Sequence, residues 1–94
     1  MTDTRDIPFT QYLRPLGKPV PVTIDRPHRI ADLAEKIIAR GFRFECEHLR
    51  TGHASFTITD EDGDADIEVV PNGPEVPSAI DRMIERFAKA RGIP

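Results

Sequence analysis

The chain has only one cysteine and no long apolar run, and both absences limit what it can be. Its cysteine, Cys46, cannot form an internal disulfide, so the fold does not rely on one. No apolar stretch approaches the roughly 18 residues that a membrane-spanning helix needs, and no apolar signal-peptide core is present. We therefore expect a cytoplasmic protein without a membrane partner.

The sequence also lacks the patterns of common catalytic and metal sites. No CxxC or HxxxH pair occurs around Cys46, His48 or His53, and there is no glycine-rich phosphate loop. No Ser-His-Asp or Cys-His-Asn set has supporting spacing. We therefore predict that the protein is not an enzyme and has no metal or other cofactor. Cys46 is expected to be buried in the core.

A basic excess is missing as well. The 94 residues carry a formal net charge of −3, and residues 31–70 hold ten acidic side chains against four basic ones. Both ends of the chain are mildly basic. This distribution argues against a general nucleic-acid binder, which usually shows a clear basic excess. A chain of this length is expected to form a single domain, residues 1–94, with residues 1–7 as a loose, flexible terminus.

The N-terminal part contains two alternating segments and one strong helical pattern. Residues 9–13 and 19–24 are predicted to be strands, and two prolines place the second strand at an edge of the sheet. Asp25 is the expected N-cap of a helix over residues 26–40, and Gly41 ends it. The apolar face of this helix consists of Ile30, Leu33, Ala34, Ile37 and Ile38.

Three alternating segments and a second helix complete the chain. Residues 42–48, 54–59 and 65–70 each place apolar side chains at every second position, as strands with one buried face do. A helical pattern begins at Pro77. The predicted fold class is α+β, a two-layer sandwich of order ββαβββα, in which a mostly antiparallel sheet carries both helices on one face.

Matching the apolar faces of the last three strands predicts their register. Phe44 is expected opposite Ile58, and Ile58 in turn opposite Ile67. A shift by one residue would turn one strand's apolar set toward solvent. These pairings leave residues 49–53 and 61–64 as the two loops.

The strongest concentration of charge is residues 60–68, which hold six carboxylates and no basic side chain. In the predicted register, Glu45 and Glu68 lie in one row on the solvent face of the sheet. Opposite charge would speed encounter with a basic partner and help to select it. We predict a small non-catalytic accessory protein that binds another macromolecule, a protein in preference to nucleic acid, through this acidic sheet face. A face that only keeps the protein soluble is the alternative. The candidate partner-binding residues are Glu45, Glu47, Asp62, Asp64, Asp66 and Glu68.

The same carboxylates invite comparison with a calcium loop. Asp60, Asp62 and Asp64 have the spacing of the first three ligands of an EF-hand. However, Ala65 and Pro71 stand where that loop requires Gly and Glu. We therefore expect a solvated turn and no metal site.

The order αβββα resembles that of double-stranded RNA-binding domains. Gly52-His53 followed by Phe56-Thr57-Ile58 is similar to the loop and second strand of that family. The resemblance implies that His53 enters an RNA minor groove. The family's lysine cluster is missing from residues 77–81, where this chain carries an aspartate. A nucleic-acid-binding module is the alternative function, and its candidate residues are Arg14, Lys18, Arg26, Arg29 and His53.

A second resemblance extends over most of the chain. Residues 9–15, 22–27, 41–45 and 71–74 are similar to small uncharacterised proteins of bacteriophages and of prophages in proteobacteria. This resemblance implies a genomic context and no mechanism.

Sheet edges are a further candidate for contact. An unpaired edge strand can pair with a second copy of the chain. We expect a monomer or a weak homodimer, with Val70 and Tyr12 as its apolar contact residues.

Overall fold

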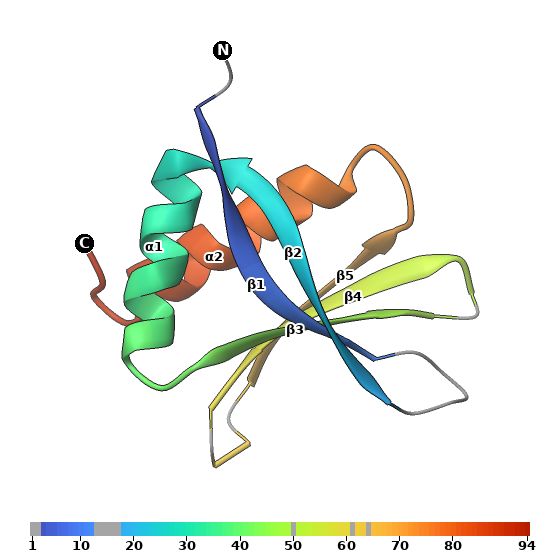
Figure 1. Cartoon of the computed structure of the whole chain (residues 1–94), viewed down its shortest axis with the longest axis horizontal. Coiled ribbons are helices and arrows are strands. Elements are labelled where there is room, and N and C mark those ends of the chain that lie inside the picture. Colours follow the sequence, from blue (N-terminus) through green and yellow to red (C-terminus); the bar gives the residue numbers. More distant parts are fainter. Residues whose placement is uncertain (1–2, 13–17, 50, 61, 64) are drawn as a thin grey trace.

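The computed structural model describes residues 3–12, 18–49, 51–60, 62–63 and 65–94. It is an α+β fold of order ββαβββα, as the sequence predicts (Figure 1). Five strands form one sheet in the order β2-β1-β3-β4-β5. The elements are β1 (Thr4–Tyr12), β2 (Pro19–Pro27), α1 (His28–Ala39), β3 (Arg43–His48), β4 (His53–Thr59), β5 (Ala65–Pro71) and α2 (Val76–Ala90).

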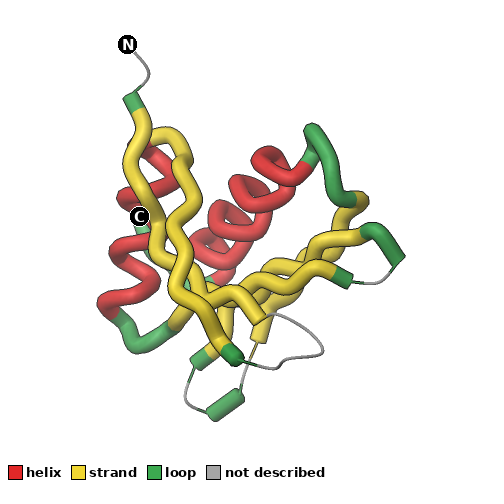
Figure 2. Tube along the Cα trace, turned by 45° about the vertical axis from the view of Figure 1, so that its right-hand side comes forward, coloured by secondary structure: helices red, strands yellow, loops and turns green. Residues whose placement is uncertain are grey.

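The sheet is mostly antiparallel and has one parallel step. β1 pairs with β2, β3 with β4 and β4 with β5 in antiparallel fashion, whereas β1 pairs with β3 in parallel. A parallel pair needs a long crossover connection, which β2 and α1 provide. The β1–β2 hairpin and the three later strands diverge; α2 lies in the angle between them, and α1 packs beside the hairpin and against α2 (Figure 2). One face of the sheet therefore carries the helices, and neither helix covers the other face.

The core lies between the helices and the inner face of the sheet. Helix α1 buries Ile30, Ala31, Ala34 and Ile37, whereas Leu33 and Ile38 of its predicted apolar face are only partly buried. It begins at His28 and is followed by Gly41, whose φ of 96° lies in the region that glycine tolerates best. The thiol of Cys46 is buried in this core, and burial raises its pKa, so the thiolate needed for nucleophilic chemistry is disfavoured. Helix α2 contributes Ala79, Ile80, Met83, Ile84, Phe87 and Ala88.

The N-terminal segment differs from the prediction of a loose terminus. Strand β1 begins at Thr4, and its first residues pair with the last residues of β2. Ile7 is almost fully buried, so residues 4–7 are held by both the ladder and the core. The Oγ1 of Thr4 donates a hydrogen bond to Asp25. Asp25 therefore belongs to β2 and does not cap α1, which follows Pro27 instead.

The structure confirms one predicted register and corrects the other. Phe44 lies opposite Ile58, as the sequence predicts. Ile58 lies opposite Asp66 on the other side, one residue away from the predicted partner Ile67. The connection between Thr59 and Ala65 is thus one residue longer than expected.

This one-residue difference exchanges the two faces of β5. Val70 points toward the core and is only 5% exposed. Ile67 and Val69 point toward the uncovered face, where they are 57% and 49% exposed. The predicted dimer contacts change accordingly, because Val70 is buried and Tyr12 belongs to β1, which lies inside the sheet between β2 and β3.

Two neighbouring valines test the register of β5. We expect Val70→Thr to lower the free energy of unfolding by about 1–3 kcal/mol, because it places a hydroxyl in the core. Val69→Thr makes the same chemical change on the exposed face and should alter the free energy by less than about 0.5 kcal/mol. Urea unfolding of both variants makes the measurement. If Val69→Thr were the more destabilising change, Val69 would be the buried valine and the register predicted from the sequence would be correct.

Candidate functional site

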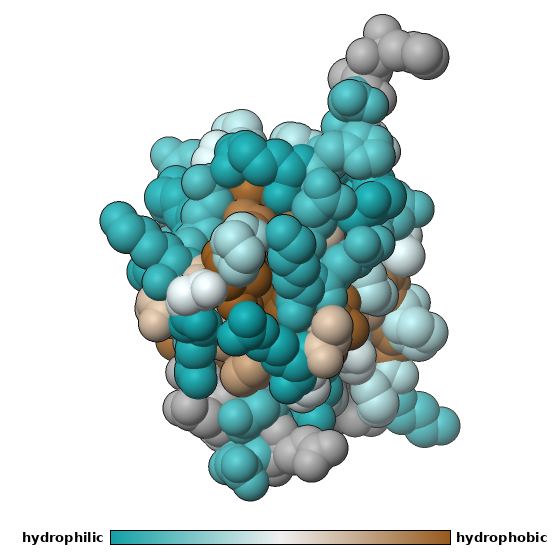
Figure 3. Space-filling model, turned by 90° about the vertical axis from the view of Figure 1, so that its left-hand side faces the viewer, coloured by the Kyte–Doolittle hydropathy of each residue, from teal (hydrophilic) through white to brown (hydrophobic). Residues whose placement is uncertain are grey.

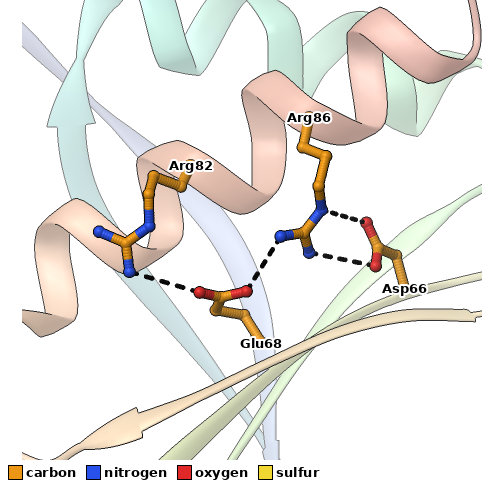
Figure 4. A network of polar contacts seen from close by, with 4 residues as sticks. All are labelled: Asp66, Glu68, Arg82 and Arg86. Atoms are coloured by element: carbon orange, nitrogen blue, oxygen red, sulfur yellow. Dashed lines mark hydrogen bonds and ion pairs between the residues drawn. The ribbon is translucent and has the colours of Figure 1, made fainter.

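The acidic strand β5 is joined to helix α2 by a network of ion pairs (Figure 4). The guanidinium of Arg86 binds Asp66 through two contacts, Nη2 to Oδ1 at 3.2 Å and Nε to Oδ2 at 3.4 Å. Its Nη1 also donates to Oε2 of Glu68 at 3.1 Å. Arg82 completes the network with a bond from Nη2 to Oε1 of Glu68 at 3.3 Å. The hydrogen bonds that Arg86 donates, those to Asp66 first and then the one to Glu68, raise its pKa.

The spacing of the two elements explains why the pairs form. Residues four apart on a helix are separated by about 6 Å along its axis, and residues two apart on a strand by about 6.8 Å. Arg82 and Arg86 therefore match Asp66 and Glu68 when β5 turns its acidic side chains toward α2. In the register predicted from the sequence, the same arginines would face Ile67 and Val69.

The predicted acidic sheet face is consequently wrong as a single surface. Glu45 and Glu47 of β3 lie on the uncovered face, in the same rows as Thr57 and Ser55. Asp66 and Glu68 lie on the opposite face, bound to α2. Asp62 is exposed in the loop after β4, where its backbone N–H donates to Oδ1 of Asp60 at 3.0 Å. Asp64 lies outside the described residues.

The uncovered face combines acidic, hydroxyl and apolar side chains in ordered rows. One row holds Tyr12, Glu47, Ser55 and Val69, one from each of the strands β1, β3, β4 and β5. The next row holds Thr10, Glu45, Thr57 and Ile67. By contrast, the side of the molecule that carries α1 is largely hydrophilic, with hydrophobic residues visible only between polar ones (Figure 3).

A small depression of about 230 Å³ lies among the polar members of these rows. The hydroxyl of Tyr12 donates a hydrogen bond of 2.6 Å to Oε2 of Glu45. The Nε of Arg43 approaches the same oxygen at 3.4 Å. Glu45 is therefore held by two neighbours through one oxygen only. The depression is lined by Tyr12, Glu45, Cys46, Glu47, Ser55 and Thr57.

A larger groove of about 410 Å³ opens on the helix side, between the β1–β2 hairpin and the start of α2. Its polar rim includes His48 and Asn72, whose side chains are 3.4 Å apart. The groove has no counterpart in the sequence analysis, because its lining comes from separate elements that no local pattern relates. Its apolar lining includes Val22, Ile24, Phe56, Val76 and Ile80.

The candidate nucleic-acid residues do not form one patch. Arg26 makes a two-point ion pair with Asp81 of α2, at 2.8 Å and 2.6 Å. Arg29 pairs with Glu85 of α2 at 3.0 Å. Lys18 precedes β2, whose far end carries Arg26, so an extended strand separates the two by up to about 26 Å. His53 contacts the hydroxyl of Thr51 at 3.0 Å, and Arg14 lies outside the described residues.

The structure was also searched for metal sites and membrane-crossing helices. Among the described residues, no three His, Cys, Asp or Glu side chains are grouped as metal ligands. Neither α1 nor α2 is long and apolar enough to cross a membrane. Comparisons of the chain with protein-family models, with curated proteins and with solved structures gave no match.

The bond between Tyr12 and Glu45 has a spectroscopic consequence. It raises the pKa of Tyr12 above the ordinary 10.0, and desolvation adds to the effect. Tyr12 is the one tyrosine of a chain without tryptophan, so ultraviolet absorbance of the phenolate reports on it alone. We expect Glu45→Gln to lower this pKa toward its ordinary value. A titration curve that the substitution leaves unchanged would contradict the bond.

The same shift fixes how stability depends on pH. A folded-state pKa raised above the unfolded value stabilises the protonated phenol, so its contribution is complete below about pH 10 and is lost as the pH rises through the folded-state pKa. The stability difference between the native protein and Glu45→Gln should therefore shrink in that range.

A second substitution tests the link between β2 and α2. The Arg26–Asp81 pair is 17% and 21% exposed, so Asp81→Asn leaves a partly buried guanidinium without its carboxylate. We expect a loss of about 1–2 kcal/mol in the free energy of unfolding, between the values for exposed and buried pairs. Glu85→Gln is the matched control, because the exposed Arg29–Glu85 pair should contribute less than about 0.5 kcal/mol. Equal effects in urea unfolding would contradict this ranking.

Proposed function

We propose that the protein is a non-catalytic accessory protein that binds another protein on the sheet face left uncovered by the helices. The observation that supports this most is the position of Ile67 and Val69. They are the exposed large hydrophobic residues of the described chain, and they lie two positions apart on this face. Exposed apolar side chains gathered beside a polar surface are typical of protein interaction sites.

The size of the apolar contribution indicates what else the interface needs. Full burial of an aliphatic side chain gives about 1.5–3 kcal/mol, so covering the exposed halves of Ile67 and Val69 gives about 1 kcal/mol each. A stable interface commonly covers about 800 Å² of each partner. The other residues of these rows, including Glu45 and Thr57 beside Ile67, must therefore belong to the contact, and Glu45 selects a partner that carries positive charge.

The two edges of the sheet differ in how open they are. The edge strand β2 contains Pro19, Pro21 and Pro27, which cannot donate backbone hydrogen bonds. The edge strand β5 contains only Pro71, at its end. The edge beside Ile67 and Val69 thus offers backbone groups to an added strand, which would extend the interface.

We also propose that the protein resides in the cytoplasm, because its single cysteine cannot form an internal disulfide.

Site-specific photo-crosslinking in the producing cell tests this proposal. A benzophenone amino acid is placed at Thr57 or Ile67 on the uncovered face, and at Lys89 or Glu75 on exposed positions of the helix side as controls. We expect both sheet-face positions to capture the same protein, identified by mass spectrometry, and the controls not to capture it. Val69→Asp should abolish the capture without unfolding the protein. Capture from the control positions alone, or capture that Val69→Asp leaves intact, would overturn the proposal.

A further inference from the structure

We infer that the depression on the uncovered face is a binding site for the guanidinium of an arginine side chain on the protein partner. The inference rests on the proposed function and specifies which chemical group the partner presents. The depression measures about 230 Å³. Pockets for whole small molecules are commonly about 300–1,000 Å³, so this one suits the head of a single side chain.

The first argument for a cation is the carboxylate of Glu45, beside which Glu47 adds a second negative charge. Glu45 and Glu47 are two positions apart on β3 and both line the depression. Tyr12 and Arg43 contact Glu45 only through Oε2, so Oε1 of that carboxylate accepts from neither of them. The Tyr12 hydroxyl also fixes the orientation of the carboxylate. An incoming donor therefore meets an acceptor that is already held in place.

The second argument is the hydroxyl of Ser55, which is independent of the acidic side chains. Ser55 is only 9% exposed and lines the depression directly opposite Glu47 in the β3–β4 pair. Its hydroxyl forms no hydrogen bond with another described side chain. No fully inaccessible polar atom is left without a partner in the described chain, so the Ser55 oxygen is reachable from the depression. A donor placed there would satisfy it.

The geometry favours arginine over lysine. A guanidinium presents five donors in a plane, enough to reach Oε1 of Glu45 and the Ser55 hydroxyl at the same time. It is also more weakly hydrated than an ammonium, so its transfer into a small depression costs less. Ile67 and Val69 adjoin the depression across β4 and would cover the aliphatic stem of that arginine or an apolar neighbour.

Nuclear magnetic resonance titration of the full chain with defined peptides tests the inference. The probe is acetyl-Leu-Arg-Leu-amide, and the matched control peptide replaces Arg by citrulline, which has the same shape without the charge. We expect saturable shifts at the backbone amides of Glu45, Glu47, Ser55 and Thr57 with the arginine peptide. The citrulline peptide should bind at least about fivefold more weakly, as loss of a charged hydrogen bond implies. A lysine peptide should bind with intermediate affinity.

Variants of the protein distinguish a specific arginine site from nonspecific electrostatic attraction of the peptide. Ser55→Ala leaves the charge unchanged and should weaken binding of the arginine peptide about threefold to tenfold. Glu45→Gln should weaken it at least as much, whereas Glu75→Gln removes a charge at the start of α2 and should have little effect. Equal effects of Glu45→Gln and Glu75→Gln, or shifts centred on Asp60 and Asp62, would overturn the inference. If the peptide fails to bind while the sheet-face crosslinks persist, the arginine site is wrong and the proposed function stands.

Discussion

The arrangement of this fold depends on the charge match between helix α2 and strand β5. Arg82 and Arg86 form ion pairs with Asp66 and Glu68 on the helix side of the sheet. Because side chains alternate along a strand, this choice also decides the direction of the residues between them. Val70 enters the core, and Ile67 and Val69 are left on the uncovered face. One set of ion pairs thus determines both what closes the core and what remains available for binding.

Ion pairs at a surface are weak, so their influence on register needs an energetic reason. An exposed pair contributes about 0.2–1 kcal/mol, less than the burial of one aliphatic side chain. However, the alternative register would expose Val70, and it would place Ile67 and Val69 beneath two guanidinium groups. The exposure of Val70 would offset part of the free energy gained by burying Ile67 and Val69, and both arginines of α2 would lose their partners. The ion pairs of α2 and the burial of Val70 therefore favour the same register.

The sequence predicts much of the fold and less of the site, for related reasons. The helix around Ile30 and Ile37 and the pairing of Phe44 with Ile58 follow from local periodicity alone. The register of β5 does not, because apolar residues occupy both of its faces and the choice depends on a helix distant in sequence. The spacing of Arg82 and Arg86 held the missing information. Glu45 and Glu47 were found as candidates, whereas the relation of Ser55 to Val69 could only follow from the correct register.

The acidic stretch from Asp60 to Glu68 is consequently divided between two roles. Asp66 and Glu68 neutralise the two arginines of α2. Asp62 is exposed in a loop, where its backbone N–H donates to Asp60. A broad acidic face would attract any basic surface and would lose most of its affinity as salt screens it. The depression that holds Glu45 and Ser55 beside Ile67 and Val69 is more selective for its partner. The partner must present a cation and an apolar group in one geometry, and salt screens the desolvated part of that contact much less.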